Sequence, residues 1–425
     1  MKKFTLFFLI AFCLTLHLNA QRKLIYCGTV IDGVSKTATT NKTIIVEKNK
    51  IIAINEGFTT PNADDQIIDL KKKTVLPGLI DMHVHLESET SKDAPTKKIG
   101  QNPADIAFEA QKNALTTLRA GFTTVRDLGG TGVNIALRNA INRGIVVGPR
   151  IFTSGKTIAT TGGHGDPTNG WREDILFPHN FADGVVNSPD EARQAVRQRY
   201  KDGTDWIKIT ATGGVLSIAK NGKAPQFQKD ELDALMATAA DYNFKVAAHA
   251  HGAEGIKRAL RAGVTTIEHG TFMDDECIAL FKEKGAYYVP TIIAGKSVAD
   301  SAKIPGYYHP LVVPKALETG PVIQATFAKA YKAGVKIAFG TDAGVYKHGL
   351  NAKEFQYMTE AGMPAMEAIQ SATIVAATVL DMQTQIGSIE VGKIADIIAS
   401  ENNPLIEIAT LMNVTFVMKE GIVYK

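Results

Sequence analysis

The stretch Leu76-Pro77-Gly78-Leu79-Ile80-Asp81-Met82-His83-Val84-His85-Leu86 decides the fold, because it indicates a loop that leads into a short buried strand. Side chains alternate between the two faces of a strand, so Asp81, His83 and His85 project to the same face. Two imidazoles at this separation can hold one metal ion. A chance His-x-His at a polar strand end would look the same, so a metal site requires further ligands elsewhere in the chain.

Short apolar runs alternate with amphipathic stretches from Leu76 onward. Stretches such as 103–120 and 230–242 predict helices between the runs, and this alternation implies parallel strands with right-handed crossovers. An open doubly wound sheet is the alternative, but it usually carries a Gly-rich phosphate turn after its first strand, where this chain has His-Val-His. Eight units therefore predict an α/β fold of the (β/α)8 TIM barrel type. The eight runs are 80–85, 123–128, 150–154, 206–210, 245–249, 265–269, 287–291 and 336–342.

Both ends of the chain have a β-like pattern without a helical period. Neither end is large enough to build its own core, so we expect the two to pack together as a small composite β-sandwich domain. This domain would comprise residues 21–75 and 383–425, and the barrel residues 76–382. The expected terminal strands are 24–26, 43–47, 51–54, 386–389, 395–399, 414–418 and 421–424.

Residues 1–20 have the pattern of a secretory signal peptide. Lys2 and Lys3 precede an apolar run over 4–16, and the small residue Ala20 precedes the polar Gln21. The run is short for a bilayer span, although an uncleaved anchor is the alternative. We expect a mature chain that begins at Gln21, has no membrane span, and is exported to the periplasm or the extracellular space.

Composition excludes some partners. The net charge of +4 over 425 residues has no clustered basic stripe, so we expect no nucleic-acid partner. Cys27 and Cys277 lie far apart and do not indicate a disulfide framework.

The expected strands end in residues that can bind metal. His249 and His251 end the fifth run, His269 the sixth and Asp342 the eighth. Lys208 lies between two outward-facing isoleucines of the fourth run, so it points inward. A buried ammonium is costly, so this lysine needs a lowered pKa, an acidic partner or a covalent modification. Barrel active sites lie at the C-terminal ends of the strands, so these residues predict one shared metal site.

These motifs resemble those of the amidohydrolase superfamily, from about Lys23 to the C-terminus. The prolidase-like branch, which hydrolyses dipeptides and N-acyl amino acids, is the most similar. The superfamily motifs are 77–85, Lys208, His249, 268–270, 340–342 and 387–396; the branch is indicated by 159–166, 212–217 and 249–252.

The resemblance implies two divalent metal ions, with zinc as the first expectation. His83, His85 and Asp342 would hold one ion, and His249 and His269 the other. Lys208 would be carboxylated by carbon dioxide and would bridge the two. A metal-bridging hydroxide would be the nucleophile, and Asp342 would accept its proton and pass it to the leaving amine.

Two further histidines are candidate substrate residues. His164 follows a Gly-Gly turn that lets the backbone approach a ligand closely, or it is simply solvated. His251 either touches substrate or supports the ligands, or it is an exposed loop residue.

The implied reaction is hydrolysis of a small peptide or an N-acyl amino acid next to its C-terminal residue. Cyclic amides, lactones or organophosphate esters are the alternative substrates for the same centre, and a binding protein without catalysis is the alternative class. Lys220 and Lys223 lie in a loop near the expected mouth, which raises the hypothesis of an acidic substrate side chain. The helical exterior of a barrel could also support a homo-oligomer.

Overall fold

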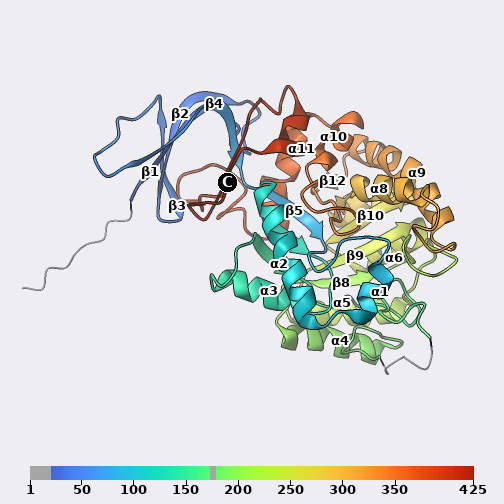
Figure 1. Cartoon of the computed structure of the whole chain (residues 1–425). Coiled ribbons are helices and arrows are strands. Elements are labelled where there is room, and N and C mark those ends of the chain that lie inside the picture. Colours follow the sequence, from blue (N-terminus) through green and yellow to red (C-terminus); the bar gives the residue numbers. More distant parts are fainter. Residues whose placement is uncertain (1–20, 173–178) are drawn as a thin grey trace, which may run out of the picture.

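The computed structural model describes residues 21–172 and 179–425. The expected signal peptide, residues 1–20, lies outside the described residues. Figure 1 shows a β-sheet part built from both ends of the chain beside a larger α/β part. In the described part of the chain, no helix combines the length and apolar character needed to cross a membrane.

The two chain ends form one seven-stranded sheet. β4 joins them, because it pairs in parallel with β1 and antiparallel with β13. The strand order is β15-β14-β13-β4-β1-β2-β3. The composite arrangement agrees with our expectation, but the strands pair as a single sheet where we expected a sandwich. Its strands are β1 (Lys23–Val30), β2 (Thr39–Glu47), β3 (Lys50–Glu56), β4 (Gln66–Pro77), β13 (Ile397–Ser400), β14 (Phe416–Lys419) and β15 (Ile422–Val423).

One shared apolar core holds this sheet together. Ile25 and Ile44 from the N-terminal strands are buried in the same cluster as Ile397 and Met418 from the C-terminal strands. The strand expected over 386–389 is absent from the structure, so that prediction was wrong. The Ile389 N–H donates instead to the Asp32 carbonyl at 2.9 Å, in a segment of turns.

The α/β part contains eight parallel strands that match the eight expected runs. They pair as a three-stranded sheet in the order β5-β6-β7 and a five-stranded sheet in the order β12-β11-β10-β9-β8. Parallel bridges Val84–Ala343 and Ile158–Ile209 connect these two sheets. The strands are β5 (Leu79–Val84), β6 (Phe122–Asp127), β7 (Arg150–Thr153), β8 (Ile207–Thr210), β9 (Val246–Gly252), β10 (Thr266–Phe272), β11 (Tyr287–Val289) and β12 (Lys336–Ile337).

Helices follow most of these strands and cover the sheets (Figure 1). The helix expected over 103–120 is α2, and the one expected over 230–242 is α5. The helices are α1 (Ala94–Gly100), α2 (Pro103–Arg119), α3 (Val133–Asn142), α4 (Pro189–Asp202), α5 (Lys229–Asp241), α6 (Ala253–Ala262), α7 (Asp275–Lys284), α8 (Ile292–Ala302), α9 (Val313–Lys332), α10 (Lys353–Glu360), α11 (Ala365–Ser371) and α12 (Ile374–Val379), with a 3-10 helix over Ile408–Asn413.

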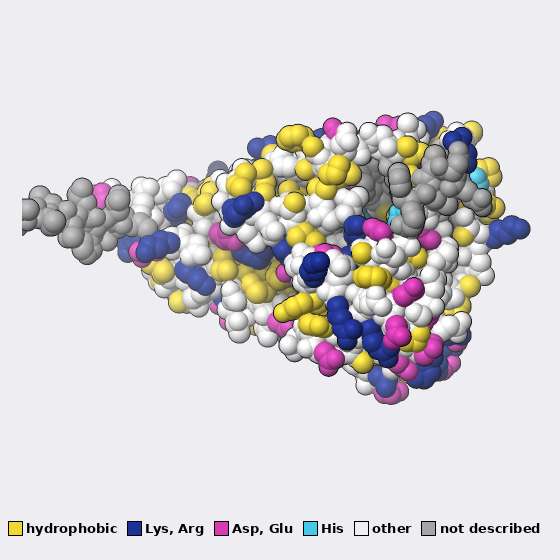
Figure 2. Space-filling view, turned by 90° about the horizontal axis from the view of Figure 1, so that it is seen from below, with side chains coloured by type: hydrophobic (Ala, Val, Ile, Leu, Met, Phe, Trp, Pro, Cys, Tyr) yellow, Lys and Arg dark blue, Asp and Glu magenta, His cyan; other side chains and the backbone are white. Residues whose placement is uncertain are grey.

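On the face shown in Figure 2, Lys and Arg side chains are interspersed with Asp and Glu. This face therefore presents no large field of one sign.

Candidate active site

The residues expected to bind metal line one cavity at the C-terminal ends of the strands. Its volume is about 150 Å³, and it also receives His164 and His251. The set is His83, His85, Lys208, His249, His269 and Asp342. The fold therefore brings together residues that are up to 259 positions apart in the chain, from His83 to Asp342.

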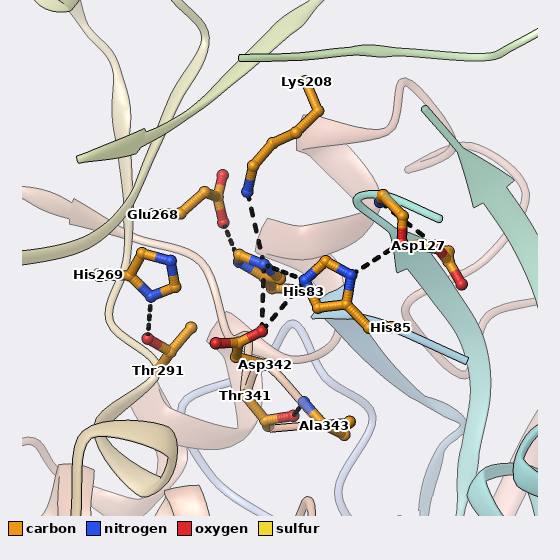
Figure 3. A network of polar contacts seen from close by, with 12 residues as sticks. His83, His85, Asp127, Lys208, Glu268, His269, Thr291, Thr341, Asp342 and Ala343 are labelled. Atoms are coloured by element: carbon orange, nitrogen blue, oxygen red, sulfur yellow. Dashed lines mark hydrogen bonds and ion pairs between the residues drawn. The ribbon is translucent and has the colours of Figure 1, made fainter. Parts of the chain in front are cut away.

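Three electron-pair donors converge at the end of β5. Asp342 Oδ1 lies 3.2 Å from His85 Nε2 and 3.5 Å from His83 Nε2, and the two imidazole nitrogens are 3.3 Å apart (Figure 3). Asp342 Oδ1 is buried, and among the described residues it has no hydrogen-bond partner. Burial raises the pKa of Asp342, but His83, His85 and Lys208 outweigh it and lower the pKa. An unsatisfied anionic oxygen facing two imidazole nitrogens is the chemistry of a cation site.

The partners of both histidines fix which ring nitrogen faces the cavity. His83 Nδ1–H donates to Glu268 Oε2 at 2.9 Å, and His85 Nδ1–H donates to the Gly129 carbonyl at 2.9 Å. Burial lowers the pKa of His83 to about 4, so its ring is neutral at neutral pH. The Nε2 lone pair of His83 is therefore directed into the cavity, as a metal ligand requires.

Glu268 belongs to a buried ion pair beneath His83. Arg126 Nη2 donates to Glu268 Oε1 at 2.9 Å, and Arg126 Nε donates to the Met82 carbonyl at 2.7 Å. Burial alone would raise the pKa of Glu268, but Arg126 and His83 outweigh it and lower the pKa to about 2. Glu268 is therefore a permanent carboxylate that orients His83.

Lys208 reaches the same point from β8. Its Nζ lies 3.5 Å from His83 Nε2 (Figure 3). Burial lowers its pKa to about 8, although Glu268 and Asp342 oppose the shift. Neither carboxylate forms an ion pair with Lys208 in the described structure, so a simple salt bridge does not account for this buried lysine.

The remaining histidines form the other side of the site. The ligand atoms of His249, His251 and His269 lie within 4.8 Å of one another, as do those of His83, His269 and Asp342. His249 Nε2–H donates to the Gly213 carbonyl at 3.2 Å, which leaves its Nδ1 lone pair free. Burial lowers the pKa of His249 and His269 well below the usual value.

Backbone strain marks two of these residues. His269 has a φ of 71° and Asp342 a φ of 62°, in the left-handed region that few non-glycine residues adopt. Asp81 fixes the backbone next to Asp342, because its carboxylate accepts hydrogen bonds from the Thr341 hydroxyl at 2.6 Å and the Asn351 amide at 2.8 Å. Strain of this kind persists where the surroundings fix a side chain for a task.

Both histidines line the cavity, where His251 is buried and His164 is half-buried, so the alternative of an exposed loop position for His251 was wrong. The His164 ring stacks on that of His249, with 4.2 Å between centroids, and its Nδ1 contacts the Ser217 hydroxyl. His251 Nδ1 lies 2.8 Å from the Thr271 hydroxyl.

Sequence reasoning missed the residues that support the ligands. Arg126 lies in β6 between Val125 and Asp127, so it lacks the two flanking isoleucines that drew attention to Lys208. Lys315 of α9 had no such signal, since a helical lysine is usually solvated. Of the two loop lysines that we considered, Lys223 forms an ion pair with Glu318, and Lys220 is exposed.

Comparison with known proteins identifies the family. The model of the amidohydrolase family matches residues 74–423. An ochratoxinase from Aspergillus niger is 33% identical over 439 residues, which cover 96% of this chain and 87% of the relative. Its crystal structure has a TM-score of 0.82 and 30% identity over 96% of each chain.

Two solved peptidase structures are also similar. A Xaa-Pro dipeptidase with methionine bound in its active site has a TM-score of 0.93 and 53% identity, over 95% of this chain and 100% of that one. A prolidase in complex with n-methylphosphonate-L-proline has a TM-score of 0.86 and 32% identity, over 95% of this chain and 99% of that one. The chain therefore belongs to the amidohydrolase family, and it is a hydrolase of amide bonds.

Proposed function

We propose that this protein is a binuclear metal-dependent peptidase that cleaves dipeptides or N-acyl amino acids next to the C-terminal residue. The observation that carries the proposal is the convergence of His83 Nε2, His85 Nε2 and the unpartnered Asp342 Oδ1. Three further donors, His249, His269 and Lys208, line the same cavity.

The donor set fits divalent ions, zinc first, because imidazole and carboxylate ligands suit zinc. His83, His85 and Asp342 would hold one ion, and His249 and His269 the other. When bound, such ions supply an activated water and polarise a carbonyl group.

The residues of the chain have separate tasks in this proposal. Lys208 would carry a carbamate formed with carbon dioxide, which burial favours because the neutral amine is the reactive form. Asp342 would accept the proton of the attacking water and return it to the leaving amine, because its lowered pKa keeps the carboxylate ionised at neutral pH. His164 and His251 would contact the substrate.

The substrate class follows from the cavity and from the relatives. Part of the cavity wall is apolar and comes from α8 and α9, which suits a small apolar side chain. This part includes Ala294, Gly295, Val298 and Ile323. The similar structures include a Xaa-Pro dipeptidase and a prolidase, which act on the bond next to a C-terminal residue.

Two further proposals concern the whole chain. The bridges Val84–Ala343 and Ile158–Ile209 support a reading of the eight parallel strands as one closed (β/α)8 barrel. Residues 1–20 would direct export to the periplasm or beyond and would be removed before Gln21.

A dipeptide and N-acyl amino acid library tests the function. Protein that begins at Gln21 is supplied with zinc and bicarbonate, and released amino acids are measured. We expect turnover on one class of C-terminal residue and its loss with a chelator. Turnover that survives complete metal removal would contradict the proposal, and turnover only on lactones, cyclic amides or phosphoesters would replace the substrate class.

A further inference from the structure

Among the described residues, Lys315 is a buried cation without an anionic partner. Its side chain projects from α9, the residue is 8% exposed, and its Nζ donates to the carbonyls of Gly214 at 2.9 Å and Ser217 at 2.7 Å. Burial lowers the pKa of Lys315, and no carboxylate of the described residues opposes that shift. A buried charge that only backbone carbonyls solvate is costly, so it needs a purpose other than stability.

The position of Lys315 links it to the active site. It lines an annex of about 20 Å³ together with Val215, His251 and Thr319, and these three residues also line the main cavity. An annex of this size has room for about one water molecule.

A second lysine of the annex gives an internal comparison. Lys223 lines the same annex, but it forms an ion pair with Glu318, which also lines it. The Lys223 charge is therefore compensated within the protein, whereas that of Lys315 is available to a ligand.

We propose that Lys315 is a specificity residue that selects substrates whose leaving amine carries a free carboxylate. In the low dielectric of the cavity an uncompensated ammonium attracts an anion far more strongly than it would in water. The carboxylate of the C-terminal residue would lie toward the annex, and the acyl group would extend toward the opposite side of the site. This inference rests on the proposed peptidase function, since it assigns the orientation of that substrate.

A loop-fixing role is the competing explanation. Lys315 anchors the segment 213–217, in which the Gly213 carbonyl contacts His249 and the Ser217 hydroxyl contacts His164. Loss of this anchor alone would disturb the site equally for charged and uncharged substrates, so the two roles differ in what they predict.

The test compares N-acetyl-L-methionine with N-acetyl-L-methioninamide as substrates of the metal-loaded enzyme. For Lys315→Met we expect kcat/KM on the free acid to fall at least tenfold further than on the carboxamide, mainly through KM. Lys315→Arg should keep the preference for the acid because it keeps the charge. Lys223→Met is the matched control, and its acid-to-amide ratio should stay within about twofold of that of the wild-type protein.

An equal fall on both substrates in Lys315→Met leaves the acid-to-amide ratio unchanged and would overturn the proposal in favour of loop fixing. Unchanged activity on both substrates would overturn both roles. Calorimetric binding of the same two compounds to the wild-type protein covers the case in which Lys315→Met does not fold, and equal affinity for acid and amide would then refute the selection. Absence of hydrolysis of every amide would count against the peptidase function, and the same binding comparison would still decide the role of Lys315.

Discussion

The orientation of each histidine at this site depends on the hydrogen-bond partner on the side away from the cavity. His83 contacts Glu268 through one ring nitrogen and faces Asp342, His85 and Lys208 through the other. Each contact constrains the next, because Glu268 fixes the tautomer and the tautomer directs the lone pair. The consequences of substitution should therefore extend beyond the residue that is changed.

Glu268→Gln should weaken both the fold and metal binding. It leaves Arg126 as a buried charge without an anion, which costs about 3 kcal/mol of unfolding free energy. It also weakens the contact that orients His83, so metal affinity should fall roughly 10- to 100-fold. Urea unfolding and zinc titration measure the two effects.

The exposed pair Glu254–Arg258 provides the control. Glu254→Gln should change the unfolding free energy by less than about 0.5 kcal/mol, because the pair is solvated. If Glu268→Gln is as mild as Glu254→Gln, the buried pair does not have the role described.

Lys208→Ala should abolish metal retention and activity together. Added short-chain carboxylic acids such as formate should restore part of both, because they would replace the carbamate in the vacated space. Elemental analysis and the amidase assay measure the outcome. Full activity in the alanine variant without added acid would remove Lys208 from the ligand set.

At this scale the sequence predicted which side chains line the cavity but not the residues that support them. His83, His85, His249, His269 and Asp342 could be found because strand ends of an α/β fold meet at one edge. Arg126 and Lys315 depend on side chains that cross between elements distant in the chain, and no local pattern encodes such a pairing.

The elements themselves were mostly predictable where their pattern is strong. The expected strands 80–85 and 123–128 begin and end within two residues of β5 and β6. β4 was not foreseen, because its middle is a run of lysines. β1 pairs with residues 66–70 and 74–75 of β4, and β13 pairs with residues 74–77, so the pairing of the flanking residues continues the strand through the lysines.

The sequence pattern over 365–380 predicts one helix, but the structure divides this segment into α11 and α12. The Ile80 N–H donates to the Ala372 carbonyl at 2.7 Å, and the Phe339 N–H donates to the Ser371 carbonyl at 3.1 Å. These carbonyls bind neighbouring strands and cannot continue the helical ladder, so tertiary contacts override the helical pattern.

Asp274→Ala should destabilise the start of α7. The Asp274 carboxylate caps the helix by accepting from the Cys277 N–H at 2.9 Å, and it lies 2.8 Å from Lys257 Nζ. Loss of such a cap costs about 1 kcal/mol at neutral pH. Asp275→Ala, at an exposed pair with Lys329, is the control and should cost much less.

The difference between wild type and Asp274→Ala should depend on pH. Burial raises the pKa of Asp274, but Lys257 and the Cys277 N–H outweigh this effect and lower the pKa to about 2 in the folded protein. A lowered folded-state pKa stabilises the protein above the unfolded-state pKa of 3.8, and this contribution is lost as pH falls from about 4 toward 2. Urea unfolding in a pH series measures this, and a gap that widens on acidification would contradict the assignment.

The whole molecule depends on its last strands. Deletion of residues 414–425 removes β14 and β15 and takes away four buried apolar side chains, Val414, Phe416, Val417 and Met418. At about 2 kcal/mol each, their loss approaches the entire stability of an ordinary domain. We expect insoluble protein or a large fall in melting temperature, measured by calorimetry.

Substitution at the exposed edge provides the comparison for that deletion. Ile422→Ser in β15 changes a residue that is 57% exposed and should alter stability by less than about 0.5 kcal/mol. A soluble deletion variant with the melting temperature of the intact chain would show that the sheet does not need its C-terminal strands.

The pairing of β4 with β13 also sets an order of events during synthesis. β4 lies between β1 and β13, and the second of these partners leaves the ribosome more than 300 residues after β4 does. Until then one edge of β4 is open, and an open edge is a template for pairing with other chains. A nascent chain of this protein must therefore be kept from its neighbours until translation is almost complete, and a chain that crosses a membrane before folding would form this sheet last.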